Sequence, residues 1–341
     1  MNLTQQHQPS TLNKVILFLV VWIPLLATAW GIVLLWNHMV NMSSLIVMLV
    51  MFILGGFGIT IGYHRMLTHK AFQAPDWVRA FFLIIGSMTL QGPALNWAAT
   101  HIQHHANSDL EGDPHSPLHN FLHGHVGWIL DDFQPDIPKY AGPLLKDPLI
   151  VFISKTFLVW VGLGLLVPTL ICGAIGTLHG GGLHGFTTGA LQGFFWGGLV
   201  RIFLNHHVTW SVNSICHTFG GRDFETTDVS RNNFIFGLLA LGEGWHNNHH
   251  AFPRSAFHGM RWWQIDPSAY LIRIMEKLGI AREVVRIAPE RLAKRRKQGV
   301  GTTEGDLLPG LHLTSEAASA VDAVTSAVSA VTQVTSATPL A

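Results

Sequence analysis

Four long apolar stretches restrict this chain to the few folds that can cross a lipid bilayer. They are Val15–Trp36, Ser44–Tyr63, Leu149–Ile175 and Phe186–Leu204. Because lipid cannot hydrogen-bond the backbone, a spanning segment must be a helix or part of a closed barrel, and a helix needs about 20 apolar residues. Hydrophobic residues make up 48% of the chain and charged residues only 12%, which is unlike a soluble domain. The sequence predicts an all-α membrane protein with four transmembrane helices.

The charge of the connecting segments predicts the orientation of these helices. The short links Asn37–Met42 and His179–Gly185 contain no Lys or Arg, whereas the segments on the other side hold nearly all of them. By the positive-inside rule, that other side and both termini are cytoplasmic. Arg201, near the end of the last span, is expected to snorkel to the interface. We therefore predict a multi-pass protein of the inner, cytoplasmic membrane.

A fifth apolar stretch, Ala80–Leu95, is too short and too interrupted to be a span. Glycine, glutamine and proline break it at Gly86, Gln91, Gly92 and Pro93. As a span it would also separate two of the histidine clusters described below, placing them on opposite sides of the membrane. We predict an interfacial helix over residues 80–95 instead.

The remaining segments complete the predicted organisation. Residues 1–14 form a cytoplasmic segment, residues 15–280 the main domain, and residues 281–298 a basic cytoplasmic helix. The tail over residues 299–341 is rich in Ala, Ser, Thr and Val and is predicted to be disordered. The net charge of +1 gives no basic field for nucleic acid, and the two cysteines imply no disulfide framework.

Three histidine clusters lie just beyond apolar stretches, at residues 64–69, 101–105 and 246–250. In the second and third, histidines at i, i+3 and i+4 share one face of a helix, and the adjacent pair diverges by about 100°. One imidazole of the pair can then face one metal ion while its neighbour faces a second. His64 and His69 are five residues apart, which suits one α-helical face poorly and predicts a helix end that unwinds as it leaves the membrane.

Asn213 and His217, at i and i+4 beyond the last span, add an amide and a further imidazole. Neutral imidazole is a good ligand for Zn, Cu, Fe and Ni. About nine nitrogens exceed the coordination of one octahedral ion, so we predict a dimetal site held by a cytoplasmic helical cap. The predicted imidazole ligands are His64, His69, His101, His104, His105, His217, His246, His249 and His250.

Histidine also has structural roles, because a lone imidazole is a common capping or interfacial group. We assign that role to the isolated histidines His7, His38, His119, His123, His179, His184, His258 and His312. For His206 and His207 the sequence leaves both a structural and a metal-binding role open, since they share a helix with Asn213. A His-rich membrane metal transporter is an alternative of another class. It would need polar or ionisable side chains near the middle of the spans, and the spans carry few.

The motifs HRxxxH, HxxHH and HxxHH, in this order and topology, resemble those of the integral-membrane fatty acid desaturases. The similarity is close to the Δ9, stearoyl-type subfamily and covers roughly residues 15–280. It rests on the runs Gly62–His69, Trp97–Pro114, His125–Trp128, Thr209–His217 and Gly242–Ala251. The resemblance implies an oxygen-dependent enzyme that makes a cis double bond in a long saturated acyl chain.

The resemblance also implies the cofactors and the substrate site. Nine histidines hold two Fe ions, Asn213 binds one of them through water, and O2 is the co-substrate. Gln91, Trp97 and Thr209 match residues that wrap the acyl chain around a bend at the reacting carbons. No His-Pro-Gly-Gly haem signature is present, so the electrons come from a separate donor, a ferredoxin or a cytochrome. A hydroxylase of the same diiron superfamily is the alternative activity.

Two departures from the family pattern bear on the substrate. Members that use acyl-CoA carry Arg-Asp before the second cluster and Arg-Lys after the His-Val-Gly-Trp run, where this chain has Ala99-Thr100 and Asp132-Phe133. Asp131 and Asp132 would repel a coenzyme A phosphate. The run His258–Trp263 looks like that of bacterial and cyanobacterial members that act on lipids. We expect an acyl lipid to be favoured over an acyl thioester.

Phe52 is a candidate for the end of the acyl site. It precedes His64 by twelve residues on the second span, about 18 Å along the axis at 1.5 Å per residue. The half of an acyl chain beyond a Δ9 bond is shorter than this, but the metal ions lie beyond the His64 backbone. We predict that Phe52 limits the chain length; the alternative is that it faces lipid.

Overall fold

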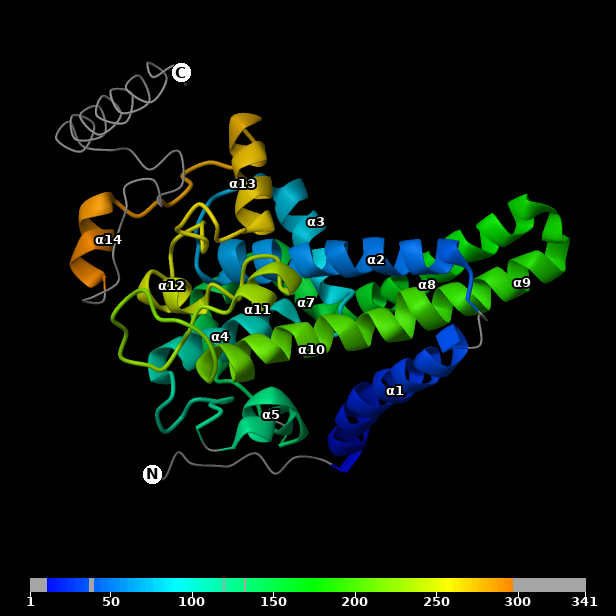
Figure 1. The fold of residues 1–341 in the computed structure, drawn as a ribbon, viewed down its shortest axis with the longest axis horizontal. Helices are drawn as coiled ribbons and strands as arrows, with labels where there is room; N and C mark the ends of the chain where they lie inside the picture. The colour runs from blue at the N-terminus through cyan, green and yellow to red at the C-terminus, as the bar shows by residue number, and fades with distance from the viewer. Residues whose placement is uncertain (1–10, 37–39, 119, 132, 297–341) are drawn as a thin grey trace, which may run out of the picture.

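The computed structural model describes residues 11–36, 40–118, 120–131 and 133–296, and these residues form helices and no β-strand (Figure 1). The predicted all-α class is confirmed. Some residues for which the sequence made a prediction are not among those that the structure describes. They are residues 1–10, His38, His119, Asp132 and the tail over residues 299–341 with His312.

Three helical stretches are long and apolar enough to cross a membrane. The first lies in α1 (Thr11–Trp36), and the second joins α2 (Met42–Phe57) to the π-helix η1 (Gly58–Thr68). The third covers residues 157–217 in six consecutive elements: α8 (Phe157–Gly176), η4 (Thr177–Gly181), α9 (Gly182–Gln192), η5 (Gly193–Val200), α10 (Arg201–Ser214) and η6 (Ile215–His217).

The third stretch folds back on itself as a hairpin of α8 and α9 (Figure 1). The turn includes Gly180, whose φ of 82° lies in the left-handed region that glycine adopts readily. The two arms approach closely, since a Cβ added to Gly189 would lie 2.2 Å from the Cys172 carbonyl oxygen. Small residues allow such packing in lipid, where no hydrophobic force drives helices together.

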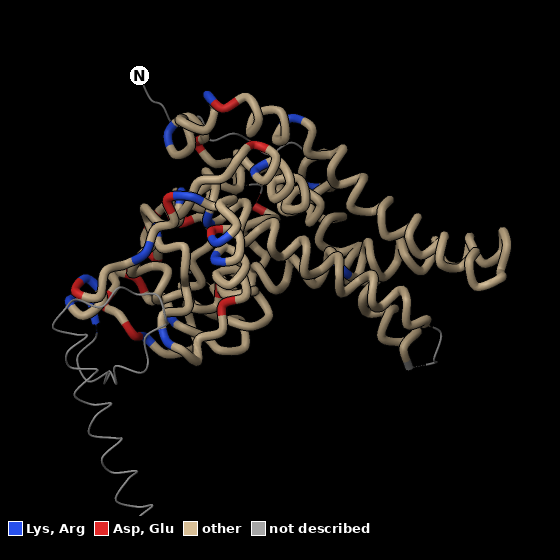
Figure 2. The backbone as a smooth tube through the Cα atoms, turned by 90° about the horizontal axis from the view of Figure 1, so that it is seen from above, with Lys and Arg blue, Asp and Glu red and all other residues tan. Residues whose placement is uncertain are grey.

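Charged residues gather at the opposite end from this hairpin, which carries none (Figure 2). We call the charged end the cap. Its elements are α3 (Asp76–Ser87), α4 (Ala94–Asn107), η2 (His123–Gly127), α5 (Trp128–Leu130), α6 (Ile137–Ala141), η3 (Gly142–Lys146), α7 (Pro148–Lys155), α11 (Phe234–Leu239), α12 (His246–Ala251), α13 (Pro267–Lys277) and α14 (Pro289–Arg295). The apolar arms and the charged cap thus occupy separate parts of the molecule.

The predicted span Leu149–Ile175 is wrong at its start. The Asp147 side chain caps α7, α7 ends before Thr156, and the apolar helix begins only at Phe157. Lys155 lies at this break, so its charge stays out of the apolar helix. The predicted span Phe186–Leu204 lies inside a longer helical run that continues through α10 into the cap.

Arg201 does not snorkel to the interface, contrary to the prediction. Its side chain is 1% exposed and donates to the carbonyl oxygens of Gly197, Met88 and Gly164. Pro168 lies four residues after Gly164 in α8 and has no N–H to bond that carbonyl. The carbonyl is therefore free to accept from the guanidinium, which is satisfied inside the protein.

Two predicted helices are shorter than expected. The interfacial helix over residues 80–95 ends at Ser87 in α3, and a loop with positive φ at Leu90 (61°) and Gly92 (96°) leads into α4. The basic helix over residues 281–298 is reduced to α14, because Arg282 and Val285 instead form backbone hydrogen bonds with residues 71–73.

Candidate metal centre

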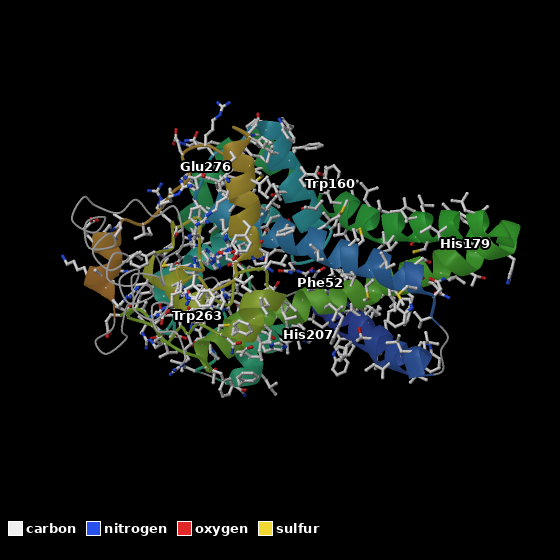
Figure 3. The ribbon with its side chains drawn as sticks, turned by 45° about the horizontal axis from the view of Figure 1, so that its top comes forward. Phe52, Trp160, His179, His207, Trp263 and Glu276 are labelled. Atoms are coloured by element: carbon white, nitrogen blue, oxygen red, sulfur yellow. The ribbon has the colours of Figure 1, made fainter. Side chains whose placement is uncertain are left out.

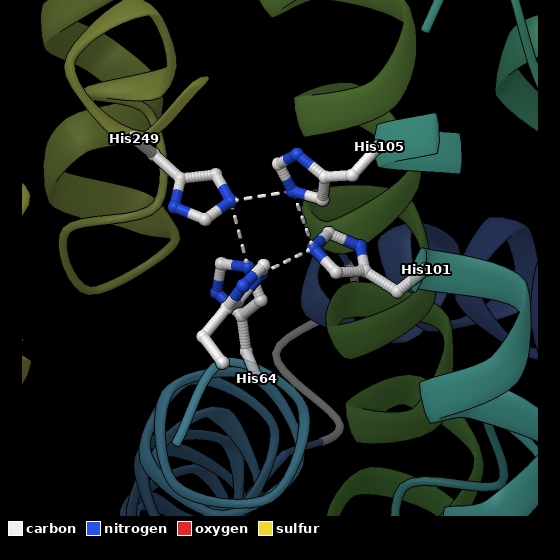
Figure 4. Close-up of side chains that lie close together, drawn as sticks. His64, His101, His105 and His249 are labelled. Atoms are coloured by element: carbon white, nitrogen blue, oxygen red, sulfur yellow. Dashed lines mark hydrogen bonds between the residues drawn. The ribbon is translucent and has the colours of Figure 1, made fainter. Parts of the chain in front are cut away.

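The histidine clusters meet in two neighbouring groups, and Figure 4 shows four members of the first. In each group the imidazole nitrogens lie within 4.8 Å of one another. We call them the five-histidine group and the four-histidine group. The first contains His64, His69, His101, His105 and His249, and the second contains His104, His217, His246 and His250. The structure thus brings together all nine histidines that the sequence singles out.

A π-helical turn carries the first cluster. His64 and His69 belong to or border η1, and the His69 amide donates to the His64 carbonyl at 3.0 Å, an i to i+5 bond. This wider turn brings residues five apart together, and the two rings lie 4.7 Å apart. The helix ends at Thr68, where a helix end was predicted, and it loosens into a π-helix rather than losing its hydrogen bonds. Single π-helical turns inside longer helices are frequent at functional sites.

The second and third clusters each divide between the two groups. On α4, His101 and His105 face the five-histidine group, while His104 faces the other. On α12, His249 faces the five-histidine group, and its neighbour His250 faces the four-histidine group. Neighbouring residues of a helix diverge by about 100°, so each short helix serves both groups at once.

Four buried carboxylates orient the imidazoles through Nδ1. His64 donates to Glu243 at 2.6 Å, His104 to Asp113 at 2.9 Å, and His217 and His250 to Asp109 and Asp228 at 2.8 Å. The sequence reasoning missed all four acids, since Asp109 is 108 residues away from His217. Asp109, Asp113 and Asp228 lie in polar runs of the sequence, so the local sequence shows no sign that their carboxylates are buried. Such partners fix the tautomer and ring orientation of metal-binding histidines.

The resulting tautomers fit a bound cation. Because His104, His217 and His250 donate through Nδ1, each has a bare lone pair on Nε2. His246 Nε2 lies 3.0 Å from His217 Nε2 and 3.1 Å from His250 Nε2, and one hydrogen can satisfy only one of these contacts. His104 Nε2 is buried without a hydrogen-bond partner. Four inward nitrogens with at most one hydrogen among them suit a shared metal ion.

The surroundings of three histidines of the five-histidine group favour the neutral imidazole. Burial, followed by the neighbouring imidazoles, lowers the pKa of His101, His105 and His249 well below the usual range. Burial alone would raise the pKa of Glu243, but His258, His64 and Arg65 lower it well below its usual range. Neutral imidazole is the form that binds Fe, Zn, Cu or Ni, and two groups of donors correspond to two ions.

Two buried asparagines explain how α12 holds its place. The Asn247 side chain accepts from the Phe224 amide at 2.8 Å and donates to the Phe224 carbonyl. The Asn248 side chain donates to the His258 carbonyl and to Gln264, both at 2.8 Å. The residues between the histidines of the third cluster thus face away from the metal groups and bind the surrounding loops.

Three histidines outside the clusters have roles that the sequence did not assign. His258 is not a lone interfacial histidine: it is buried, and its Nδ1 lies 3.2 Å from Glu243. His206 donates to backbone carbonyls, and His207 lies 2.9 Å from His125, so neither joins a metal group. His179 at the hairpin turn lies 2.8 Å from the Ile175 carbonyl, as a capping histidine does.

Two cavities meet beside the five-histidine group. The inner cavity runs between α2 and α10, and its apolar lining includes Phe52, Ile59, Val208, Val212, Leu239 and Leu241. The outer cavity lies between α1, the α3–α4 loop and α10, and its lining includes Leu17, Gln91, Asn96, Thr100, Trp128 and Gln134. Both are lined by Trp97, His101, Thr209 and Asn213, which we call the neck.

The side chains proposed from the sequence for the substrate all lie along these cavities. Trp97 stacks on His101 with ring centroids 5.1 Å apart. The Gln91 amide donates to the Thr209 hydroxyl at 3.0 Å. Phe52 lies on α2 at the inner cavity (Figure 3), so it does not simply face lipid.

Known proteins are similar to most of this chain. The pattern of the family described as "Fatty acid desaturase" matches residues 42–281. A hex-5-enoyl-[acyl-carrier protein] acetylenase of Moorena producens (strain JHB) is 38% identical over 77% of this chain and 83% of its own. An sn-1 stearoyl-lipid 9-desaturase of Anabaena variabilis is 36% identical over 70% and 82%. An acyl-CoA C20 Delta5-desaturase of Anemone leveillei is 39% identical over 72% and 73%.

Proposed function

Because the chain belongs to the fatty acid desaturase family, we propose that it introduces a cis double bond at Δ9 into a long saturated acyl chain carried by a membrane lipid. Desaturases are oxidoreductases, and relatives with this Δ9 activity in their names include two sn-1 stearoyl-lipid 9-desaturases. Others act at position 5 or form a triple bond. The observation that carries the proposal is the meeting of two cavities at a neck beside the histidine groups.

Two iron ions are the proposed cofactors, one in each histidine group, and Asn213 would reach one of them through water. When bound, iron supplies the activation of O2 and the removal of hydrogen from two neighbouring carbons. The four buried carboxylates would keep the imidazoles that they bind, those of His64, His104, His217 and His250, in the tautomer whose Nε2 lone pair faces inward. A separate ferredoxin or cytochrome supplies the electrons.

The neck is proposed to select the reacting carbons. An acyl chain that fills both cavities must pass Trp97, His101 and Thr209, so one carbon pair is held beside the metal groups. Holding reactants in a fixed geometry is a large source of catalytic rate. The apolar inner cavity excludes water from the methyl half of the chain, and Phe52 is proposed to close its far end.

The same arrangement supports an orientation in the membrane. Counting the two arms of the α8–α9 hairpin separately gives four proposed crossings, with the uncharged turn on the far side. Lys and Arg lie almost entirely with the cap, which the positive-inside rule places in the cytoplasm. The outer cavity is lined by Leu17 and Val20 of α1 and therefore opens beside a proposed membrane helix, within reach of a lipid.

Substrate form is tested by supplying labelled saturated chains as lipid or as CoA ester to membranes containing the protein, iron and reductant. We expect the lipid to be preferred. Ala99 is fully buried, so a basic residue there could not reach the outer cavity, whereas Thr100 lines it and Asp131 is exposed nearby. Thr100→Arg with Asp131→Arg should raise CoA-ester use by about 2- to 30-fold, as exposed ion pairs contribute ~0.2–1 kcal/mol each.

Glu290→Arg on α14 is the matched control, because it changes the charge at an exposed position of another cap helix. Preferential use of the CoA ester by the unmodified protein would contradict the lipid proposal. Analysis of the product also tests the reaction type, since an alkene retains no oxygen from labelled O2 and an alcohol does.

Asn213→Ala is expected to lower activity less than His217→Ala. The amide is proposed to reach its metal ion only through water, and loss of such a supporting group typically costs about 10–100-fold. His217 Nε2 instead points directly into the four-histidine group. Iron content and product yield should be measured on both variants. Equal and complete loss of iron would show that Asn213 is as essential as an imidazole.

Phe52→Ala is expected to shift the products toward longer chains. Phe52 lines the inner cavity, so its removal lengthens the space for the methyl end and leaves a void that lowers stability. Leu54→Ala is the control, because Leu54 lies on the same helix and is 37% exposed. The ratio of sixteen- to eighteen-carbon products should change only in Phe52→Ala. An unchanged ratio at normal protein levels would rule out this role for Phe52.

A further inference from the structure

The loop between α3 and α4 is held against α10 by a row of polar contacts. Arg201 Nη1 donates to the Met88 carbonyl at 2.7 Å. His206 Nε2 lies 2.9 Å from the Thr89 carbonyl and 3.1 Å from the Leu90 carbonyl. Because carbonyls only accept, Nε2 must carry the hydrogen of His206. Two side chains of one helix thus bind three successive carbonyls.

This row ends at the neck of the cavities. The side chain of the next loop residue, Gln91, donates to the Thr209 hydroxyl at 3.0 Å and lies 3.4 Å from the Asn205 carbonyl. Thr209 lines both cavities. As the loop proceeds from residue 88 to 91, its partners on α10 proceed from Arg201 through His206 to Thr209. The loop and the helix therefore have a fixed register.

The backbone of this loop contains a strained residue. Leu90 has a φ of 61°, in the left-handed region that is unfavourable for a residue with a bulky side chain. Such strained residues cost of order 1–3 kcal/mol and persist where the surrounding structure holds them. The His206 ring on α10 binds the Thr89 and Leu90 carbonyls, which precede and follow the Leu90 α-carbon.

We propose that His206 and Arg201 are positioning residues that determine which carbon pair of the acyl chain is desaturated, because they fix Gln91 and Thr209 at the neck. The inference rests on the proposed function, since it takes the two cavities as the acyl site. A slip of the loop by one residue moves extended backbone by about 3.3 Å. That is more than the spacing of neighbouring carbons in an acyl chain, so a slip presents another pair to the metal groups.

The test is the distribution of double-bond positions formed from a saturated eighteen-carbon chain by membranes containing the full chain. In His206→Ala, desaturation at the original pair should fall about 10–100-fold, as expected for a misplacement of about 1 Å, and isomers at neighbouring positions should appear. His206→Gln, whose amide can donate to the same carbonyls, should restore the original position. His207→Ala is the control, because the His207 ring lies 2.9 Å from the His125 ring and, within the part of the chain that the structure describes, makes no hydrogen bond to this loop.

A second measurement shows whether His206 acts through Gln91. The double variant His206→Ala with Gln91→Ala should shift the products no further than Gln91→Ala alone, since coupled residues are not additive. Iron content should match the wild type in all variants. Arg201→Lys keeps the charge but can reach fewer carbonyls, so it should shift the products too, and it supplies the test if His206→Ala does not accumulate.

A lower yield in His206→Ala with an unchanged double-bond position would overturn the inference, and so would additive shifts in the double variant. A wild-type product at a position other than Δ9 would overturn the proposed regiochemistry alone. The comparison of variants would still test the role of His206, because each shift is measured from the double-bond position that the wild type produces.

Discussion

His105→Ala should abolish desaturation and release iron from the cap. His105 Nε2 lies 3.0 Å from His101 Nε2 and 2.8 Å from His249 Nε2, and its ring stacks on His250 with centroids 4.5 Å apart. It therefore holds one group directly and packs against the other. Loss of a supporting residue lowers metal affinity about 10–100-fold, and loss of a direct ligand should exceed this range.

The measurement is a fatty-acid analysis of a host that makes the protein, together with iron per purified chain. His184→Ala is the matched control, because this imidazole is exposed on α9 at the far end of the hairpin. The control should give wild-type product, while His105→Ala should give none. Wild-type yields from His105→Ala would show that the five-histidine group is not the catalytic metal site.

Glu243→Gln should weaken metal binding about 10–100-fold without removing any imidazole. The Glu243 carboxylate accepts from His64 Nδ1 at 2.6 Å and from Arg65 Nε at 3.2 Å. An amide has only one oxygen, so its NH2 group would face one of these donors. His64 can relieve that conflict by moving its hydrogen to Nε2, which points toward His249 Nε2 at 3.1 Å. A protonated Nε2 no longer has a lone pair for a metal ion.

The readout is the iron affinity of the purified protein, and added iron should restore part of the activity. Arg65 keeps its two contacts to Asp266 at 3.0 Å, which preserves the local fold. Glu276→Gln on α13 is the control, because Glu276 pairs with Arg286 away from the histidines. An unchanged iron affinity in Glu243→Gln would mean that the His64 tautomer does not depend on this carboxylate.

The sequence determined those features that follow from local periodicity and composition. Long apolar runs predicted helices long enough to cross a bilayer, and the structure has three such helical stretches among its described residues. The helical period predicted that the adjacent pair His104 and His105 diverges by about 100°, and in the structure the two imidazoles belong to different groups. That His101 joins His105 rather than His104 became clear only from the structure. Four crossings, the cytoplasmic orientation and iron binding stay predictions that the proposed experiments test.

The tertiary structure decided the features that depend on residues far apart in the chain. The acids that orient His217 and His64 lie 108 and 179 positions away, so no local pattern pairs them. The π-helical turn at His64 was not predicted, because residues five apart do not share a face of an α-helix. They do share a face once the backbone bonds run from i to i+5, as between the His64 carbonyl and the His69 amide. The sequence predicted that Arg201 snorkels to the interface. In the structure α8 instead brings the Gly164 carbonyl within hydrogen-bonding distance of the Arg201 guanidinium. In each case a buried polar group finds its partner only after distant helices have packed.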